Sequence, residues 1–219
     1  MSELFDELRA AVGAEAPVAL ATVVEGPGIG GKLLVRPDHE PLGSLGDADL
    51  DRVVARDALG ELSAGALTRV GKVLGYRVTV CDAREVFATK ARFPFADEVV
   101  VDWPHRLLER VGPSLGPRDA VCVLTHDPKF DVPAVKAALA TDVGYLGAMG
   151  SRRTTDDRNR RLRDEGVGDD QLVRVMAPIG IDIGARTPEE TAVSILAEII
   201  ACRTGRRVSS LRDAEGSIH

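Results

Sequence analysis

An α/β fold, built on a parallel sheet with helices on both faces, is predicted by two patterns in the sequence. Beyond residue 75, short apolar runs alternate with amphipathic stretches of helical period. Buried parallel strands have continuous apolar sequences because helices cover both faces of their sheet. Three of the apolar runs end in polar loops, as expected at the edge where such a sheet binds ligands.

The first 62 residues predict a small α+β domain ahead of this sheet. Residues 4–12 have the apolar spacing of a short helix. Two apolar runs, 17–26 and 26–38, are joined by glycines and predict a hairpin-like unit. A turn and a second helix, which ends at residue 62, are expected to complete this domain.

The second helix is expected to be capped by Asp47 or Asp49, whose side chains can accept a hydrogen bond from the first turn. Its buried face is expected to consist of Leu50, Val53, Val54 and Leu59. Residues 63–65 are small and interrupt the apolar pattern, so we interpret them as a junction.

The second domain is then expected to span residues 63–205, followed by a flexible polar tail at 206–219. Its strands are expected at residues 76–82, 97–103, 119–126, 143–150 and 173–180. Its helices are expected at residues 66–75, 104–111, 132–140, 151–165 and 188–202.

Composition narrows the function classes. The net charge of −6 over 219 residues argues against a general nucleic-acid binder, which normally has a basic surface. The three cysteines are far apart and lack metal-ligand spacing, which favours a reducing compartment. No signal peptide and no apolar run long enough for a membrane span is present, so a cytoplasmic protein is expected.

The sharpest local signal is a predicted anion site where a strand meets a helix. It consists of Gly150, Ser151, Arg152 and Arg153. Free backbone N–H groups at a helix start, together with two guanidinium groups, attract anions such as phosphate. The alternative is an ordinary capped surface helix, in which Asp156 and Asp157 neutralise the arginines.

Two further loops are expected at the same edge. In the first, Thr125 and His126 follow a strand, Asp127 and Asp131 are expected to cap the next helix, and His126 is the best candidate for proton transfer or ligand contact. The second contains Gly180, Asp182 and Arg186. The last two could form an internal ion pair or contact a ligand, and the Thr187 and Glu190 that follow resemble a capping box.

Asp82 ends a strand at the position where dinucleotide-binding folds place a ribose-binding carboxylate. A strand and a G-x-G-x-x-G turn normally precede it, and the sequence before Tyr76 contains neither. NAD(P) is therefore not the expected cofactor. Because no nucleophile elbow, HExxH, CxxC or P-loop is present either, turnover chemistry of the chain's own is not expected.

These loops and their flanking segments resemble the XdhC/CoxI family of maturation factors for molybdenum hydroxylases. The resemblance covers residues 76–203 and rests on GYRVTVCDAREVFATKARFP, ADEVVVDWPHRLL, VCVLTHDPKFDVP, GYLGAMGSRRT and APIGIDIGARTPEETAVSILAEIIA. Two earlier stretches, PVALATVVEGPG and KLLVRPDHEPLGSLGDADLD, are similar to the family's N-terminal domain.

The resemblance implies a Rossmann-like C-terminal domain and a protein that binds molybdenum cofactor (molybdopterin). Such proteins assist sulfuration of the cofactor and its insertion into xanthine dehydrogenase or CO dehydrogenase-type enzymes. The implied partners are the apoenzyme of a molybdenum hydroxylase, a cysteine desulfurase and a second copy of the chain in a homodimer. The loops at 150–153, 125–127 and 180–186, together with Asp82, would then bind the cofactor.

The sequence departs from the family pattern in two places. Asp49 stands where many members have a cysteine suspected of contacting molybdenum, and a carboxylate is a harder ligand than a thiolate. The segment with the family's first Rossmann strand and glycine loop is missing before residue 67. Strand 77–82 must therefore find another neighbour or become an edge strand.

Two other functions fit parts of the sequence. An NAD(P)-dependent oxidoreductase would explain the alternating pattern and Asp82. A degenerate family member that acts only through protein partners would explain the missing segment, and it predicts protease sensitivity near residues 63–75.

Overall fold

The computed structural model describes residues 3–125, 127–210 and 212. Its N-terminal part contains helix α1 (Glu3–Gly13) and strands β1 (Ala19–Thr22), β2 (Lys32–Val35) and β3 (Leu42–Ser44). The strands form an antiparallel sheet in the order β1-β2-β3, which confirms the expected hairpin. The third strand was not predicted, because it is only three residues long and its sequence is typical of a turn.

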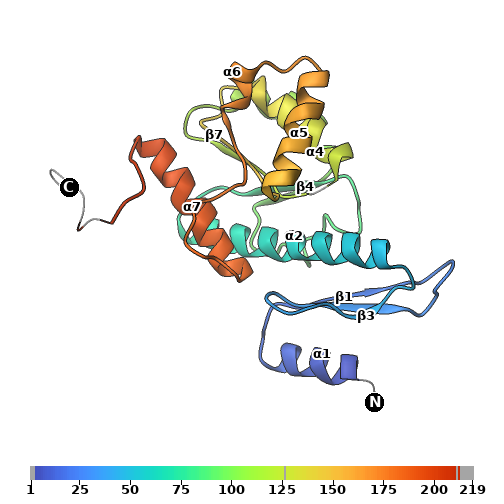
Figure 1. The fold of residues 1–219 in the computed structure, drawn as a ribbon. Helices are drawn as coiled ribbons and strands as arrows, with labels where there is room; N and C mark the ends of the chain where they lie inside the picture. Colours follow the sequence, from blue (N-terminus) through green and yellow to red (C-terminus); the bar gives the residue numbers. More distant parts are fainter. Residues whose placement is uncertain (1–2, 126, 211, 213–219) are drawn as a thin grey trace.

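The central strand β2 carries the core of this part. Leu33, Leu34 and Val35 are each at most 2% exposed. Helix α1 lies on one face of the sheet and helix α2 (Ala48–Val73) lies on the other (Figure 1). The result is a three-layered unit, in which α2 also belongs to the rest of the molecule.

Helix α2 is one continuous helix of 26 residues, so the expected break at 63–65 does not occur. Of the two predicted alternatives, Asp47 rather than Asp49 caps it, by accepting a hydrogen bond from the Leu50 amide at 2.8 Å. Ser63 is one of the buried residues of this helix. A run of small residues can mark a junction between domains, or it can allow a helix to pack closely against its neighbours. The sequence pattern alone does not distinguish these two cases.

The predicted apolar face of α2 is correct only at Val54, which packs against the core of the N-terminal part. Leu50, Val53 and Leu59 are 42%, 45% and 39% exposed. Its buried positions are occupied mostly by small residues: Ala55, Gly60, Ser63, Ala66, Thr68 and Gly71. The reason is that α2 packs against the N-terminal sheet at one end and against helix α7 (Pro188–Thr204) at the other, where close approach excludes large side chains.

The second part contains parallel strands in two sheets, where one continuous sheet was expected. Strands β4 (Thr79–Asp82) and β5 (Glu98–Val101) form one pair. Strands β6 (Ala120–Val123), β7 (Tyr145–Ala148) and β8 (Val175–Met176) form the other sheet in that order. Among the described strands β4 pairs only with β5, so it is an edge strand, as the missing segment predicted.

Helices cover both faces of the sheet β6-β7-β8, as predicted for this α/β fold. All four residues of β7 are buried. On one face, α4 (Pro128–Leu139) and α5 (Arg152–Asp164) contribute Val135 and Leu162 to a core with Leu146 of β7. On the other face, Ile195 of α7 packs with Tyr145 and the second half of α2.

Shorter elements complete the second part: α3 (Pro104–Val111), η1 (Gly112–Ser114) and α6 (Asp169–Leu172). None of the helices in the described ranges is both long and apolar enough to cross a membrane.

Candidate functional site

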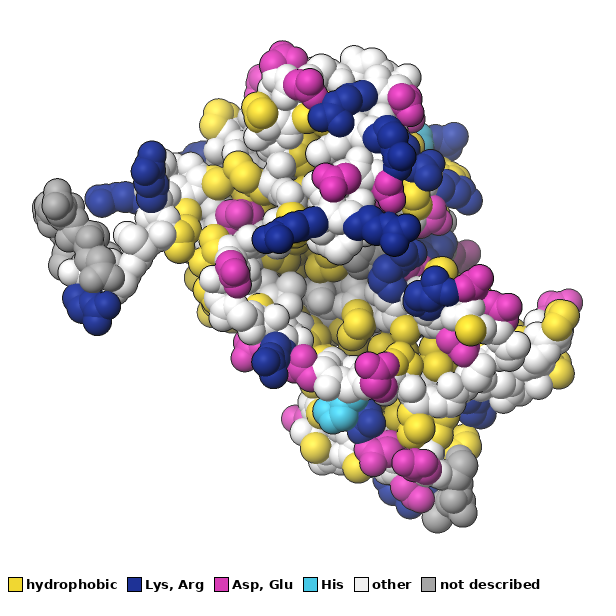
Figure 2. Space-filling model, in the orientation of Figure 1, with side chains coloured by type: hydrophobic (Ala, Val, Ile, Leu, Met, Phe, Trp, Pro, Cys, Tyr) yellow, Lys and Arg dark blue, Asp and Glu magenta, His cyan; other side chains and the backbone are white. Residues whose placement is uncertain are grey.

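A cleft of about 280 Å³ lies where α2 passes the loops that follow β7 and β8. Its walls consist of Pro37, Arg56, Leu59, Gly60, Ser63, Met149, Arg186, Pro188 and Thr191. Figure 2 shows a hollow on this face between α2 and the part of the molecule that contains α4 and α5. Lys and Arg side chains border this hollow. The cleft therefore joins the N-terminal part of the molecule to the carboxyl edge of the sheet.

The charged side chains that line this cleft are both arginines, Arg56 and Arg186. Within the described part of the chain, Arg56 has a single carboxylate contact, at 3.8 Å from Asp57. Two guanidinium groups with no acidic group among the described lining residues favour an anionic ligand. The apolar lining residues provide a surface for a flat or hydrophobic portion of that ligand.

The sequence did not predict that residues of α2 line a cleft. Gly60 and Ser63 lie one helical turn apart and line the cleft together with Arg56. Small residues at this spacing on a helix are a signal for close packing. The same stretch also fits the end of a helix followed by a junction, and that interpretation gives no indication of a binding site.

The predicted anion loop has the expected local structure. Ser151 caps α5, and its hydroxyl accepts a hydrogen bond from the Thr154 amide at 3.2 Å. The side chains of Arg152 and Arg153 are exposed and form no ion pair or hydrogen bond within the described residues. Asp157 pairs with Arg160 instead, so the alternative of neutralised arginines is not observed.

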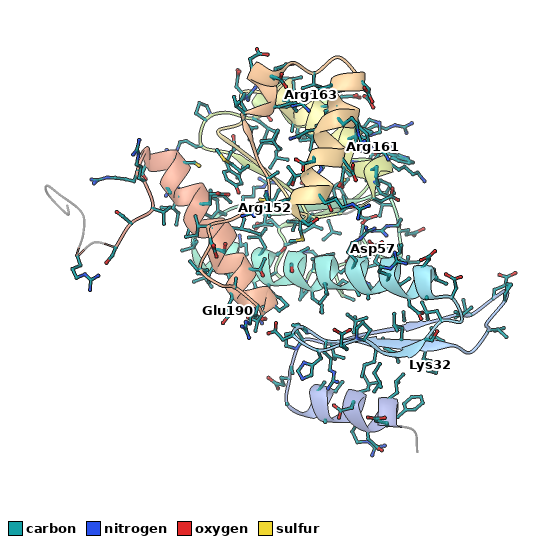
Figure 3. All side chains as sticks on the ribbon, viewed as in Figure 1. Lys32, Asp57, Arg152, Arg161, Arg163 and Glu190 are labelled. Carbon is teal, nitrogen blue, oxygen red and sulfur yellow. The ribbon has the colours of Figure 1, made fainter. Side chains whose placement is uncertain are left out.

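The start of α5 also faces the cleft. Figure 3 shows Arg152 at the end of α5 that lies nearest to α2, while Arg163 lies at the far end. Met149, which precedes this loop, lines the cleft directly. Gly150 has φ +144°, a conformation that side chains rarely adopt, and a Cβ there would lie 3.0 Å from the side chain of Thr154. The loop thus turns sharply between the cleft wall and the helix.

The loop after β6 is stabilised mainly by hydrogen bonds among its own residues and with the start of α4. Asp127 caps α4 by accepting a hydrogen bond from the Lys129 amide at 2.9 Å, as predicted. The Asp127 amide in turn donates to the Thr125 hydroxyl at 3.1 Å. Neither residue lines the cleft. His126 lies outside the described residues.

The predicted capping role of Asp131 is wrong. Its side chain is 3% exposed and forms an ion pair with Arg158 of α5, at 3.2 Å between Oδ2 and Nη2. Burial raises the pKa of the Asp131 carboxyl to about 6, and the nearby Arg158 opposes that shift. Because its partner lies 27 residues away in the sequence, local pattern did not reveal this pair.

The loop after β8 is shaped by contacts with α7. Gly180 has φ +95°, and its amide donates to Oε2 of Glu198 at 2.8 Å. A Cβ at this position would lie 2.4 Å from the Ser194 hydroxyl oxygen. Gly180 is therefore required for packing against α7, whereas its predicted contact with a ligand stays a prediction.

Asp182 and Arg186 do not form the ion pair that was one of two alternatives for them. The Asp182 carboxylate lies 3.4 Å from the Gly184 amide, and the Arg186 amide donates to Glu190 at 2.8 Å. Arg186 lines the cleft, but Asp182 does not. The capping box of Thr187 and Glu190 is confirmed.

The carboxylate of Asp82 is paired with an arginine side chain. This carboxylate accepts hydrogen bonds from Arg84 Nε at 2.9 Å and Nη2 at 2.7 Å. Arg84 also lies 3.7 Å from Glu61 and 3.9 Å from Asp57, both on α2. Burial, followed by the Asp82 carboxylate, raises the pKa of Glu61 to about 7, and burial also raises the pKa of Asp57. This end of β4 is an acidic cluster around one cation, which disfavours phosphate.

The described residues offer no metal centre. They contain no group of three or more His, Cys, Asp or Glu side chains placed to hold a metal ion. Asp49 lies at the start of α2, where it pairs with Arg52 and its side chain is 85% exposed. Cys81 and Cys122 are free thiols, and burial raises the pKa of Cys122 to about 12.

Comparison with known proteins places this fold in a family. The model of the XdhC Rossmann domain matches residues 60–199, and the model of the XdhC and CoxI family matches residues 11–71. The crystal structure of a xanthine dehydrogenase from Bacillus halodurans has a similar fold, with a TM-score of 0.56 and 21% identity. That similarity covers 94% of this chain and 66% of the other.

Two curated relatives are similar in sequence. A probable xanthine dehydrogenase subunit of Bacillus subtilis (strain 168) is 33% identical over 129 residues, which is 59% of this chain and 36% of that protein. The molybdenum cofactor insertion chaperone PaoD of Escherichia coli (strain K12) is 37% identical over 84 residues, or 38% of this chain and 26% of PaoD. This chain thus matches about a third or less of each relative. Since one family model spans more than half of it, the chain belongs to the XdhC family.

Proposed function

We propose that this chain assists the maturation of a molybdenum enzyme by binding molybdenum cofactor in the cleft between α2 and the loops after β7 and β8. The observation that supports the proposal most strongly is the lining of the cleft, where both charged residues are arginines. The cofactor carries phosphate on a flat pterin, so it needs both cations and apolar surface. PaoD, a relative whose name describes cofactor insertion, supports the same role.

The binding mode follows from the geometry of the site. Arg56 and Arg186 would hold phosphate inside the cleft, and Arg152 and Arg153 would attract it from the rim. The volume of about 280 Å³ lies at the lower limit for ligand sites. The protein would act as a carrier, without turnover chemistry of its own.

The finer steps are part of the proposal. The bound cofactor would be protected during sulfuration by a cysteine desulfurase and then delivered to the apoenzyme of a xanthine dehydrogenase or CO dehydrogenase-type hydroxylase. A homodimer and a cytoplasmic location are consistent with that role. These partners are inferred from the XdhC family and from the names of its relatives.

The test is isothermal titration of the chain with molybdenum cofactor, released freshly from a molybdoenzyme under anaerobic conditions. We expect saturable binding near one cofactor per chain, and strong loss of affinity in the double variant Arg56→Ala/Arg186→Ala. Arg163→Ala is the matched control, because it removes an arginine from the far end of α5. Equal binding by the parent and the double variant would disprove this site.

A nicotinamide-dependent oxidoreductase is less compatible with the structure. The Asp82 carboxylate that would hold a ribose hydroxyl is paired with Arg84. Thermal protection by NAD(H) or NADP(H), without protection by molybdenum cofactor, would nevertheless favour that function. A chain that unfolds cooperatively but binds neither ligand would favour a role through protein partners alone.

A further inference from the structure

A buried ion pair lies beside the proposed site without lining it. The side chains of Arg158 on α5 and Asp131 on α4 are 2% and 3% exposed. Asp131 Oδ1 and the Nε and Nη1 atoms of Arg158 have no hydrogen-bond partner in the described part of the chain. Taking two charges out of water is costly, and apolar replacements of such pairs are often neutral or stabilising. Stability alone is therefore a poor explanation for this pair.

Arg158 makes one more contact, and that contact reaches the cleft. Its Nη2 atom, which pairs with Asp131, also donates a hydrogen bond to the backbone carbonyl of Met149. Met149 is part of the cleft wall. The guanidinium group thus joins a buried carboxylate on α4 to the backbone of the cleft.

The segment around Met149 is held from two other sides. The Met149 amide donates to the Val123 carbonyl of β6 at 2.8 Å. The Ala148 carbonyl accepts a hydrogen bond from Ile179, in the loop after β8, at 3.1 Å. Arg158 supplies the remaining contact, from α5. Without it, the turn at Gly150 that leads to Arg152 and Arg153 would lose its side-chain connection to α5, while the contacts with β6 and the loop after β8 would remain.

We propose that Asp131 and Arg158 are a positioning pair, which fixes the Met149 carbonyl and so sets the cleft wall and the adjoining anion loop in the geometry that binds ligand. Arg158 holds the carbonyl, and Asp131 orients Arg158. Since Asp131 belongs to the helix that Asp127 caps, the pair also couples the loop after β6 to the loop after β7. The effect on ligand affinity rests on the proposed function, whereas the effect on the loop does not.

The decisive variant replaces both charges, Asp131→Leu/Arg158→Met. It leaves no unpaired buried charge, so we expect a folded protein with a melting temperature near that of the parent. Amide hydrogen exchange in residues 147–153 should be faster by about ten-fold or more, since a hydrogen bond to a charged group is lost. Affinity for molybdenum cofactor should fall by a similar factor.

The control is Leu162→Ala, on the same helix one turn further along. Leu162 is fully buried, and its truncation should lower the melting temperature. It does not contact Met149 through a hydrogen bond, so exchange in residues 147–153 and cofactor affinity should stay at the parent values at a temperature where the variant is folded. A second comparison is Arg158→Lys, which keeps a donor and should restore part of the protection.

Two outcomes would overturn the positioning role. One is parent-like exchange in residues 147–153 of the double variant. The other is equally increased exchange in Leu162→Ala, which would show that the loop responds only to general loss of stability. If the parent itself binds no cofactor, the proposed function fails, and the exchange comparison still decides whether this pair positions the loop.

Discussion

Arginine side chains lie near the carboxyl ends of both β4 and β7, but their surroundings are opposite. At the end of β4, Arg84 is surrounded by Asp57, Glu61 and Asp82. At the end of β7, Arg152 and Arg153 have no partner within the described residues. At the end of β4 the arginine is neutralised by carboxylates of the protein, whereas at the end of β7 the arginines remain available to a ligand.

The comparison shows when a charged residue at a strand end is available for binding. Asp82 stands where a ribose-binding carboxylate would be, yet its oxygens are occupied by one guanidinium group. A ligand would have to replace that bidentate pair, which is among the stronger polar contacts in proteins. The loop after β7 requires no such exchange, so it is the better candidate site.

The largest expected effect is on the buried pair behind the β7 loop. Arg158→Met alone should lower the free energy of unfolding by about 3–5 kcal/mol, because it leaves the Asp131 carboxylate buried and unpaired. Since the pKa of Asp131 is already raised to about 6, the loss should be smaller at pH 5, where this carboxyl is protonated. Urea denaturation at pH 5 and pH 8 measures both values, and equal losses would contradict the charge explanation.

The next effect concerns Glu61 in the β4 cluster. Its pKa is raised from 4.5 to about 7, so the folded protein holds the proton more tightly than the unfolded chain. Stability should therefore fall as the pH rises from about 4.5 to about 7. Glu61→Gln stays neutral, and it should be more stable than the parent by up to about 3 kcal/mol at pH 8 and equal to it below pH 4.5.

Urea denaturation of Glu61→Gln at pH 4, 6 and 8 tests this sign. Glu85→Gln is a suitable control, because Glu85 is exposed in the loop that follows β4. Its effect should stay within about 0.5 kcal/mol at each pH. A difference between Glu61→Gln and the parent that does not change with pH would contradict the prediction.

A smaller effect is expected for Arg84→Met. It removes the bidentate contact with Asp82 and the stacking of the guanidinium group over Phe87, whose ring centre lies 4.0 Å away. The free energy of unfolding should fall by about 1–2 kcal/mol, and cofactor binding should not change. Loss of binding in a variant that remains folded would place ligand at the β4 end and reverse the comparison.

The smallest effect on stability is expected at the open arginines. Arg152→Ala/Arg153→Ala should change the free energy of unfolding by less than about 0.5 kcal/mol, because no contact within the described residues is lost. It should still weaken cofactor binding several-fold or more. Thermal unfolding and titration of this variant, compared with Arg84→Met, separate a structural arginine from a binding arginine.

Much of the local structure was predictable from the sequence. The caps by Asp47, Ser151 and the Thr187–Glu190 box were predicted and are observed, as is the hairpin of β1 and β2. These features depend on hydrogen bonds between residues a few positions apart, so a short stretch of sequence contains both partners. That the loop at residues 150–153 binds an anion stays a prediction.

Other features were decided only by the tertiary structure. The continuous helix α2 and its buried face depend on α7 and the N-terminal sheet, and both partners lie elsewhere in the chain. The cleft wall from Arg56 and Gly60 depends on the same packing.

The sequence by itself determined the α/β class and the capped start of α5 at Ser151, because periodicity and capping are local. Only the tertiary structure decided that Asp131 pairs with Arg158 and that Asp82 is held by Arg84 while Arg152 stays open. The physical reason is that a charge is satisfied by whichever group the fold brings within a few ångströms, and sequence separation does not determine that distance.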